Sequence, residues 1–153
     1  MTTPEQRLAE LGLEVPQVAK PVAAYVPAVR SGSYVYTSGQ VPLRDGELIH
    51  AGKLGGDVSV EQGVECARQC ALNALAAVRA EVGELSQVKR VVKVVAFVAS
   101  TPDFTGQPGV ANGASELLGE VFGETGQHAR SAVGVAALPL DAPVEVELVV
   151  EVA

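Results

Sequence analysis

The chain has 153 residues, of which 48% are hydrophobic, 19% charged and 4% aromatic, and its net charge is −7. This composition excludes a disordered chain, and an acidic protein without a run of lysine or arginine is not expected to bind nucleic acid. Because no secretion signal and no membrane-spanning apolar run is found, we expect a soluble, cytoplasmic protein whose residues 1–153 form one domain.

Two local signals organise the N-terminal third of the chain. Thr3-Pro4-Glu5-Gln6 is a capping box with proline at the first helical position, which predicts a short helix that ends at Gly12. Residues 1–19 are therefore interpreted as a helical extension. Two β-rich runs on either side of Arg30-Ser31-Gly32-Ser33 predict a β-hairpin, and Asp45-Gly46 predicts a second turn.

The middle of the chain predicts two long helices separated by a strand. A second capping box at Ser59 begins a helix that continues to about Val82, with apolar residues at helical spacing. Residues 91–98 are β-branched and apolar on both faces, which predicts a fully buried central strand. After a loop at residues 101–109, the next helix is expected from about Val110 to Phe122.

Two strands end the chain, at residues 131–138 and 144–152, with the turn PLDAP between them. In the last strand valine and leucine alternate with glutamate, so apolar side chains share one face. A simple hairpin of these strands places Arg130 opposite Glu151 and Glu145 opposite Ala136. The order of elements predicts an α+β fold, a mixed β-sheet with both long helices packed on one face.

This arrangement has a consequence for assembly. The helices can cover one face of the sheet, whereas the central strand is apolar on both faces. Because large exposed apolar patches usually mark interfaces, we expect further copies of the chain to cover the second face, and hence a homo-oligomer.

The sequence offers little support for a metal or a cofactor. Cys66 and Cys70 lie four residues apart on one helix face without a second cysteine pair, so packed, reduced thiols are expected. His50 and His128 are too few and too scattered for a metal site. The motifs GxxxxGK[ST], GxSxG and HExxH are absent from the sequence. We expect neither a metal nor a cofactor.

Three segments together resemble the reactive-intermediate deaminase family (RidA/YjgF). They are Tyr25 with YTSGQ at 36–40, VVAFV at 94–98, and ARSAVGVAALP at 129–139 with VEVE at 144–147. The resemblance covers about residues 20–153, and shorter members lack the N-terminal helix. It implies a chorismate-mutase-like fold and a homotrimer with ligand clefts between subunits, which agrees with the expected homo-oligomer.

The resemblance also implies an activity. Members hydrolyse reactive 2-imino acids or enamines, such as 2-iminopropanoate and 2-iminobutanoate, to 2-keto acids and ammonia, and so protect pyridoxal-phosphate enzymes. By this resemblance Arg130 binds the substrate carboxylate and Glu145 handles water as the catalytic acid. The implied substrate-binding positions are Tyr25, Ser38, Gly39, Asn112 and Ala132.

Plainer interpretations remain open for several of these residues. Arg130 on its own fits a structural salt bridge or a solvated strand end, Glu145 fits a solvated acidic stripe, and Asn112 fits a helix cap. A meeting of Arg130 and Glu145 needs a shifted register, long side chains across the sheet, or a neighbouring subunit.

Two other functions are weighed against the deaminase. A non-catalytic binder of small carboxylates such as 2-keto acids would use Arg130 without Glu145. Nucleic-acid cleavage or inhibition of translation, also attached to the family, is disfavoured by the net charge of −7.

Overall fold

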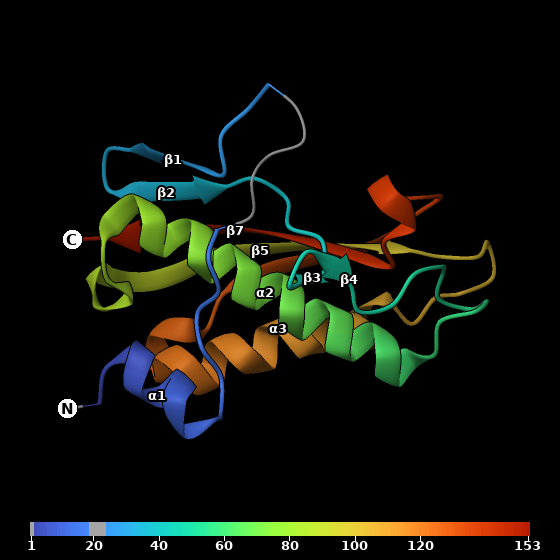
Figure 1. The fold of residues 1–153 in the computed structure, drawn as a ribbon, viewed down its shortest axis with the longest axis horizontal. Helices are drawn as coiled ribbons and strands as arrows, with labels where there is room; N and C mark the ends of the chain where they lie inside the picture. Colours follow the sequence, from blue (N-terminus) through green and yellow to red (C-terminus); the bar gives the residue numbers. More distant parts are fainter. Residues whose placement is uncertain (1, 19–23) are drawn as a thin grey trace.

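The computed structural model describes residues 2–18 and 24–153, and its elements follow the predicted order (Figure 1). The helices are α1 (Pro4–Glu10), α2 (Val60–Val82) and α3 (Gln107–Phe122), with short 3-10 turns η1 (Leu85–Gln87), η2 (Gly123–Gly126) and η3 (Pro139–Asp141). The strands are β1 (Ala28–Ser31), β2 (Tyr34–Thr37), β3 (Leu43–Arg44), β4 (Glu47–Leu48), β5 (Val88–Ala99), β6 (Ala129–Val135) and β7 (Val144–Val152).

Both predicted capping boxes are confirmed. The Thr3 hydroxyl accepts the N–H of Gln6, and the Ser59 hydroxyl accepts the N–H of Gln62, each at 3.1 Å. In return, the side-chain oxygen of each glutamine accepts the backbone N–H of its capping residue. Helix α2 ends where predicted, because Gly83 adopts a φ of 93° that favours glycine.

The cap at Ser59 gives a test of how much α2 depends on local signals. Ser59→Ala removes the acceptor for an otherwise unpaired N–H, so we expect the free energy of unfolding to fall by about 1 kcal/mol. Urea titration followed by circular dichroism measures this change. Ser86→Ala, at an exposed serine outside the long helices, is the control and should change the unfolding free energy by less than about 0.5 kcal/mol.

The main sheet has five strands in the order β1-β2-β7-β5-β6. Strands β5 and β6 are parallel and the other neighbours antiparallel, so the predicted mixed sheet is confirmed. The predicted hairpin of the last two strands is wrong, because β5 lies between β6 and β7. Helix α3 carries the chain across the sheet after β5, and such a crossover places the next strand parallel to the first.

The observed register of β6 and β7 with β5 separates Arg130 from Glu145. Arg130 pairs with Val94 instead of lying opposite Glu151, and Glu145 pairs with Phe97 instead of lying opposite Ala136. Leu140 and Asp141, both with positive φ, lie in the connection between β6 and β7. That connection carries the chain past β5, so that β7 pairs with the edge of β5 opposite to the one that pairs with β6.

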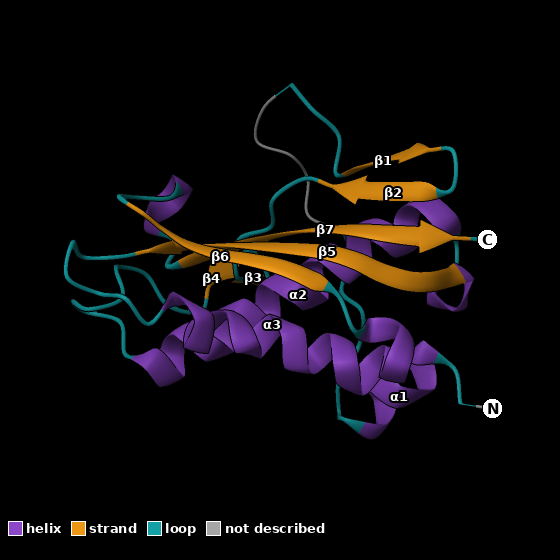
Figure 2. Cartoon of the chain, turned by 180° about the vertical axis from the view of Figure 1, so that it is seen from behind, coloured by secondary structure: helices purple, strands orange, loops and turns teal. Residues whose placement is uncertain are grey.

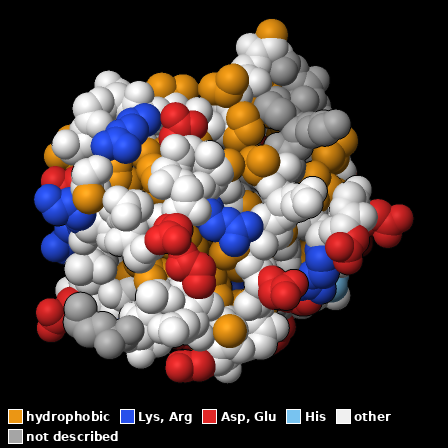
Figure 3. Space-filling view, turned by 60° about the vertical axis from the view of Figure 1, so that its left-hand side comes forward, with side chains coloured by type: hydrophobic (Ala, Val, Ile, Leu, Met, Phe, Trp, Pro, Cys, Tyr) orange, Lys and Arg blue, Asp and Glu red, His pale blue; other side chains and the backbone are white. Residues whose placement is uncertain are grey.

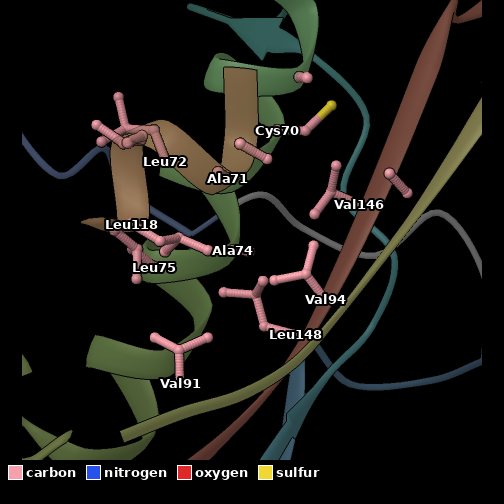
Figure 4. Close-up of a cluster of buried hydrophobic side chains, with 14 of the residues drawn as sticks. Cys70, Ala71, Leu72, Ala74, Leu75, Val91, Val94, Leu118, Val146 and Leu148 are labelled. Atoms are coloured by element: carbon pink, nitrogen blue, oxygen red, sulfur yellow. The ribbon is translucent and has the colours of Figure 1, made fainter. Parts of the chain in front are cut away.

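The core lies between the sheet and helices α2 and α3, which cover one face as predicted (Figures 1 and 2). Leu75 of α2 and Leu118 of α3 point toward Val94 of β5 and Leu148 of β7 (Figure 4). Along β7 each buried residue alternates with a half-buried one, so the predicted period of two is confirmed. Small side chains on α2 allow this close packing.

The second face of the sheet carries no helix of the described residues. In β5 the residues of this face, among them Val95 and Phe97, are half-buried, so the prediction of a strand buried on both faces is wrong for the single chain. Val29, Tyr36 and Val133 expose 52%, 47% and 44% of their surface. Apolar side chains of four strands are therefore left partly open to solvent.

The two cysteines are free and buried in α2, as predicted. Burial raises the pKa of the Cys66 thiol to about 12 and raises that of Cys70 well above its usual range. Such thiols are poor nucleophiles, because the thiolate is the reactive form. Within residues 2–18 and 24–153, no three His, Cys, Asp or Glu side chains gather as metal ligands, and no helix is long and apolar enough to cross a membrane.

Candidate functional site

Arg130 stands at the start of the edge strand β6, and α3 holds its guanidinium. Nη1 donates to Asn112 Oδ1 at 2.8 Å and to Ser115 Oγ at 3.2 Å, and Nη2 donates to the carbonyl of Pro108 at 3.3 Å. These three α3 residues follow one another at spacings of four and three, so they share one side of the helix. The helix thus fixes the cation at the edge of the sheet.

The hydrogen bonds leave part of the guanidinium free. Of its five N–H groups, three have partners, and Nε–H and one N–H of Nη2 make no hydrogen bond to the described residues. The salt bridges found among the same residues do not include Arg130. Two donors on neighbouring nitrogens are suited to the two oxygens of a carboxylate. The interpretation of Arg130 as a structural salt bridge is therefore not supported.

Asn112 lies one turn further inside α3 than predicted. The helix begins at Gln107, because Gly106 occupies its N-cap and Pro108 lies in its first turn. Asn112 therefore caps nothing, and its side-chain oxygen accepts from Arg130 instead. This corrects the interpretation of Asn112 as a helix cap and brings it together with Arg130.

A histidine joins this group through Ser115. His128 lies two residues after η2, and its Nδ1 is 2.6 Å from the carbonyl of Gly126, which can only accept. In the neutral ring Nε2 is then the acceptor, and it lies 2.8 Å from Ser115 Oγ. Donation therefore runs in one direction, from Arg130 to Ser115, from Ser115 to His128, and from His128 to Gly126.

These side chains surround a shallow cavity of about 350 Å³, called here the Arg130 cavity. It is lined by Asn112, Ser115, Gly119, Gly126, Gln127, His128 and Arg130. Gly119 continues the α3 stripe by one more turn and leaves open space, because a Cβ there would meet no atom within 4 Å. The cavity can therefore admit a small polar molecule next to the Arg130 guanidinium.

Gly39, a further residue implied by the resemblance, lies beside Glu145 of β7, and Ser38 comes directly before Gly39 in the chain. The Glu145 side chain lies directly over Gly39, where a Cβ would overlap its carboxylate. Ser38 donates its hydroxyl to the carbonyl of Val26 at 2.5 Å, which ties the segment of Tyr25 to the same region. The Tyr25 side chain is 48% exposed. A side chain at position 39 would therefore have to displace the Glu145 carboxylate from its place.

Half-burial makes the Glu145 carboxyl group a weaker acid than an exposed glutamate. Loss of hydration raises its pKa above the ordinary value, and the neighbouring carboxylate of Glu147 raises it further. A carboxyl group with a raised pKa keeps its proton closer to neutral pH, which suits a group that donates or accepts protons. Glu145 therefore differs from an ordinary solvated glutamate of an acidic stripe.

The raised pKa predicts a pH-dependent cost to stability. The folded chain holds the Glu145 carboxyl proton more tightly than the unfolded chain does. The protonated carboxyl group therefore stabilises the fold, and this contribution to the free energy of unfolding is lost as the pH rises through the raised pKa. Glu145→Gln does not titrate. The free energy of unfolding of the variant, relative to wild type, should therefore rise between about pH 4 and about pH 7. Urea titrations across this range test it, and a constant difference would contradict the assignment.

Within one chain the two groups of residues do not meet. Arg130 lies in register with Val94 and Glu145 with Phe97, about 10 Å apart along the strands. Arg130 reaches toward α3, whereas Glu145 faces the uncovered side of the sheet. Of the three routes by which they could meet, a shifted register and side chains across the sheet are thus not supported, which leaves a neighbouring subunit.

Ala132 belongs to neither group. It pairs with Ala96 and packs, half-buried, against the hydrophobic core. Conversely, sequence reasoning missed Ser115 and His128. A helix begun at Gln107 puts Pro108, Asn112, Ser115 and Gly119 on one side, and this spacing could have indicated Ser115. His128 precedes Arg130 by two residues, but its contact with α3 has no signal in the sequence.

Comparison with known proteins assigns the family. A family model described as "YjgF/chorismate mutase-like, putative endoribonuclease" matches residues 5–152. Protein TCP17 of Trypanosoma cruzi is 48% identical, covering 94% of this chain and 91% of the relative. The structure of a "putative endoribonuclease" from Shewanella oneidensis is 37% identical with a TM-score of 0.96, covering 99% of this chain and all of that one.

A more distant structure carries a ligand. Escherichia coli TdcF, solved with bound serine, is 26% identical with a TM-score of 0.62, covering 90% of this chain and 94% of that one. The chain belongs to the YjgF/chorismate mutase-like family, so the resemblance and the chorismate-mutase-like α+β fold are both confirmed. The family match begins within α1.

Proposed function

We propose that the protein hydrolyses reactive 2-imino acids, or their enamine tautomers, to 2-keto acids and ammonia. The observation that carries the proposal is Arg130, a cation held by α3 with two N–H donors free for a carboxylate. The resemblance to the reactive-intermediate deaminase (RidA/YjgF) family implies this reaction class, and the chain belongs to the YjgF family. The serine bound to TdcF supports a ligand of this size and chemistry, because serine carries the same carboxylate as an imino acid.

The proposed reaction divides between the two groups of residues. Arg130 binds the carboxylate through two parallel hydrogen bonds, worth on the order of 1.5–3 kcal/mol, and so orients the C=N carbon. Water adds its oxygen to that carbon, the C–N bond breaks, and ammonia leaves. Glu145, with its raised pKa, transfers protons between the water and the nitrogen. In this proposal, Tyr25, Ser38 and Gly39 line the side of the substrate cleft that lies opposite Arg130.

A homotrimer would join these groups. We propose that Arg130 of one subunit faces Glu145 of the next, in a cleft between them. The partly exposed apolar side chains on the uncovered face of the sheet support such an assembly, since they would be buried by neighbouring copies. Light scattering on the purified protein tests the stoichiometry.

The direct test is a coupled reaction. A pyridoxal-phosphate dehydratase acting on serine or threonine releases 2-iminopropanoate or 2-iminobutanoate, and semicarbazide traps what survives. Adding the protein should speed loss of trappable imine in proportion to its concentration. An unchanged loss, at protein concentrations up to that of the dehydratase, would exclude the activity for these substrates.

The rival function is a non-catalytic binder of small carboxylates, and Glu145 separates the two. Under the proposed mechanism, Glu145→Gln should slow imine hydrolysis by about 10²–10⁴-fold, while a 2-keto acid still binds at Arg130. Two quantities are measured for wild type and for Glu145→Gln: the rate of imine hydrolysis, and the Kd of the 2-keto acid by calorimetry. Binding by wild type without any hydrolysis would favour the binder.

The descriptions of the family and of the Shewanella protein mention an endoribonuclease. Binding RNA requires lysine and arginine to neutralise phosphates. This chain has 11 of these residues against 18 acidic ones, and on the face shown in Figure 3 the two kinds are intermixed. These observations favour a small anionic substrate over RNA. Incubation with labelled RNA should leave it intact.

A further inference from the structure

The Arg130 cavity extends from the guanidinium to His128, and none of its lining residues carries an apolar or an acidic side chain. No aliphatic or aromatic hydrocarbon side chain lines this space, so an alkyl group there would gain little from contact with apolar side chains. A polar group instead meets an amide, a hydroxyl and an imidazole. The cavity therefore has the chemistry of a polar subsite next to the carboxylate site.

We infer that the Arg130 cavity holds the substrate side chain and selects imino and keto acids whose side chain ends in a second acidic group. His128 is the specificity-determining residue. The inference rests on the proposed function and names the substrate class of the same site.

The hydrogen bonds of Ser115 explain how His128 acts. With a neutral ring, the Ser115 hydroxyl donates to Nε2 and accepts from Arg130. When Nε2 gains a proton it becomes the donor, and Ser115 Oγ then accepts from both His128 and Arg130. The hydroxyl hydrogen must turn away from both, toward the cavity. The cavity thereby gains a positive charge and a hydroxyl donor, both suited to a second carboxylate.

Two cations lie near His128. Arg130 of β6 donates to Ser115, which also bonds to His128, and Arg90 of β5 donates to the carbonyl of Gln127, next to His128, at 3.1 Å. Among the described residues no carboxylate bonds to His128 or Arg130, and Glu120 of α3 pairs with Arg68 at 3.4 Å. A second carboxylate of the ligand supplies the missing negative charge. Its binding is then coupled to proton uptake and strengthens as the pH falls.

Calorimetry with two stable keto acids tests the inference on the full-length protein. The probes are 2-oxoglutarate, with a terminal carboxylate, and 2-oxohexanoate, with an alkyl end. In wild type, 2-oxoglutarate should bind about tenfold more tightly at about pH 6, and this preference should shrink toward about pH 8. In His128→Gln, which does not titrate, the preference should be smaller and constant with pH. His50→Gln, at the other histidine, should behave as wild type.

The outcomes separate this inference from the function beneath it. Equal affinity for the two acids, tighter binding of 2-oxohexanoate, or the same pH dependence in His128→Gln overturns the inference alone. If neither acid binds, the carboxylate site at Arg130 fails, and the inference fails with it. A preference that becomes smaller and constant with pH in His128→Gln, and stays as in wild type in His50→Gln, supports it.

Discussion

Replacing Arg130 with lysine is expected to reduce kcat/KM for imine hydrolysis by about 10- to 100-fold, although the charge is kept. Lysine has one nitrogen where the guanidinium has three, so it cannot hold Asn112 and Ser115 and also present two donors to a carboxylate. Arg130→Ala removes the charge as well and should cost more than about 100-fold. Steady-state kinetics of the coupled reaction measures both variants, and the Kd of a 2-keto acid should weaken in parallel.

Arg30 provides the matched control for this prediction. It lies on β1, and its guanidinium also donates to backbone carbonyls, those of Gly32 and Ala153. Arg30→Lys should leave kcat/KM within a factor of about two, because surface contacts of this kind contribute little. Wild-type kinetics in Arg130→Lys would mean that a point charge suffices, and that the bidentate contact is not part of the mechanism.

The parts of the fold that could be predicted are those with local causes. Both capping boxes, the β1–β2 turn and the alternation along β7 depend on residues within a few positions of one another. The pairing of β6 with β5 depends instead on a crossover through α3. A short connection between two strands suggests a hairpin, and only the packing of α3 beside the sheet decides against it.

In the candidate site, too, the contacts that depend on tertiary packing could not be predicted from local sequence. Resemblance to the family indicated Arg130, Asn112 and Glu145, and the structure puts the first two in contact. It places Glu145 elsewhere, over Gly39. His128 was discounted in the sequence because the two histidines are too few and too scattered for a metal site. Its role depends on η2 and α3 bringing it to Ser115, which is a tertiary contact without a local pattern.

Mixing two inactive variants is expected to restore activity if the cleft lies between subunits. Arg130→Ala chains retain Glu145, and Glu145→Gln chains retain Arg130. In trimers assembled from equal amounts of both, about a quarter of the clefts have an intact arginine side and an intact glutamate side. The hydrolysis rate should therefore reach about a quarter of the wild-type rate, although each variant alone is nearly inactive. The measurement is the coupled reaction on co-expressed, differently tagged chains.

The control for this experiment uses two variants from the same side of the cleft. Asn112 and Arg130 bond to each other within one chain, so a mixture of Arg130→Ala and Asn112→Ala yields no chain with both partners. That mixture should gain nothing over the sum of its components. If Arg130→Ala and Glu145→Gln chains co-assemble and the rate still does not rise, the two residues do not serve one cleft. The group that transfers protons next to Arg130 would then be sought in its own chain, where His128 and not Glu145 lines the Arg130 cavity.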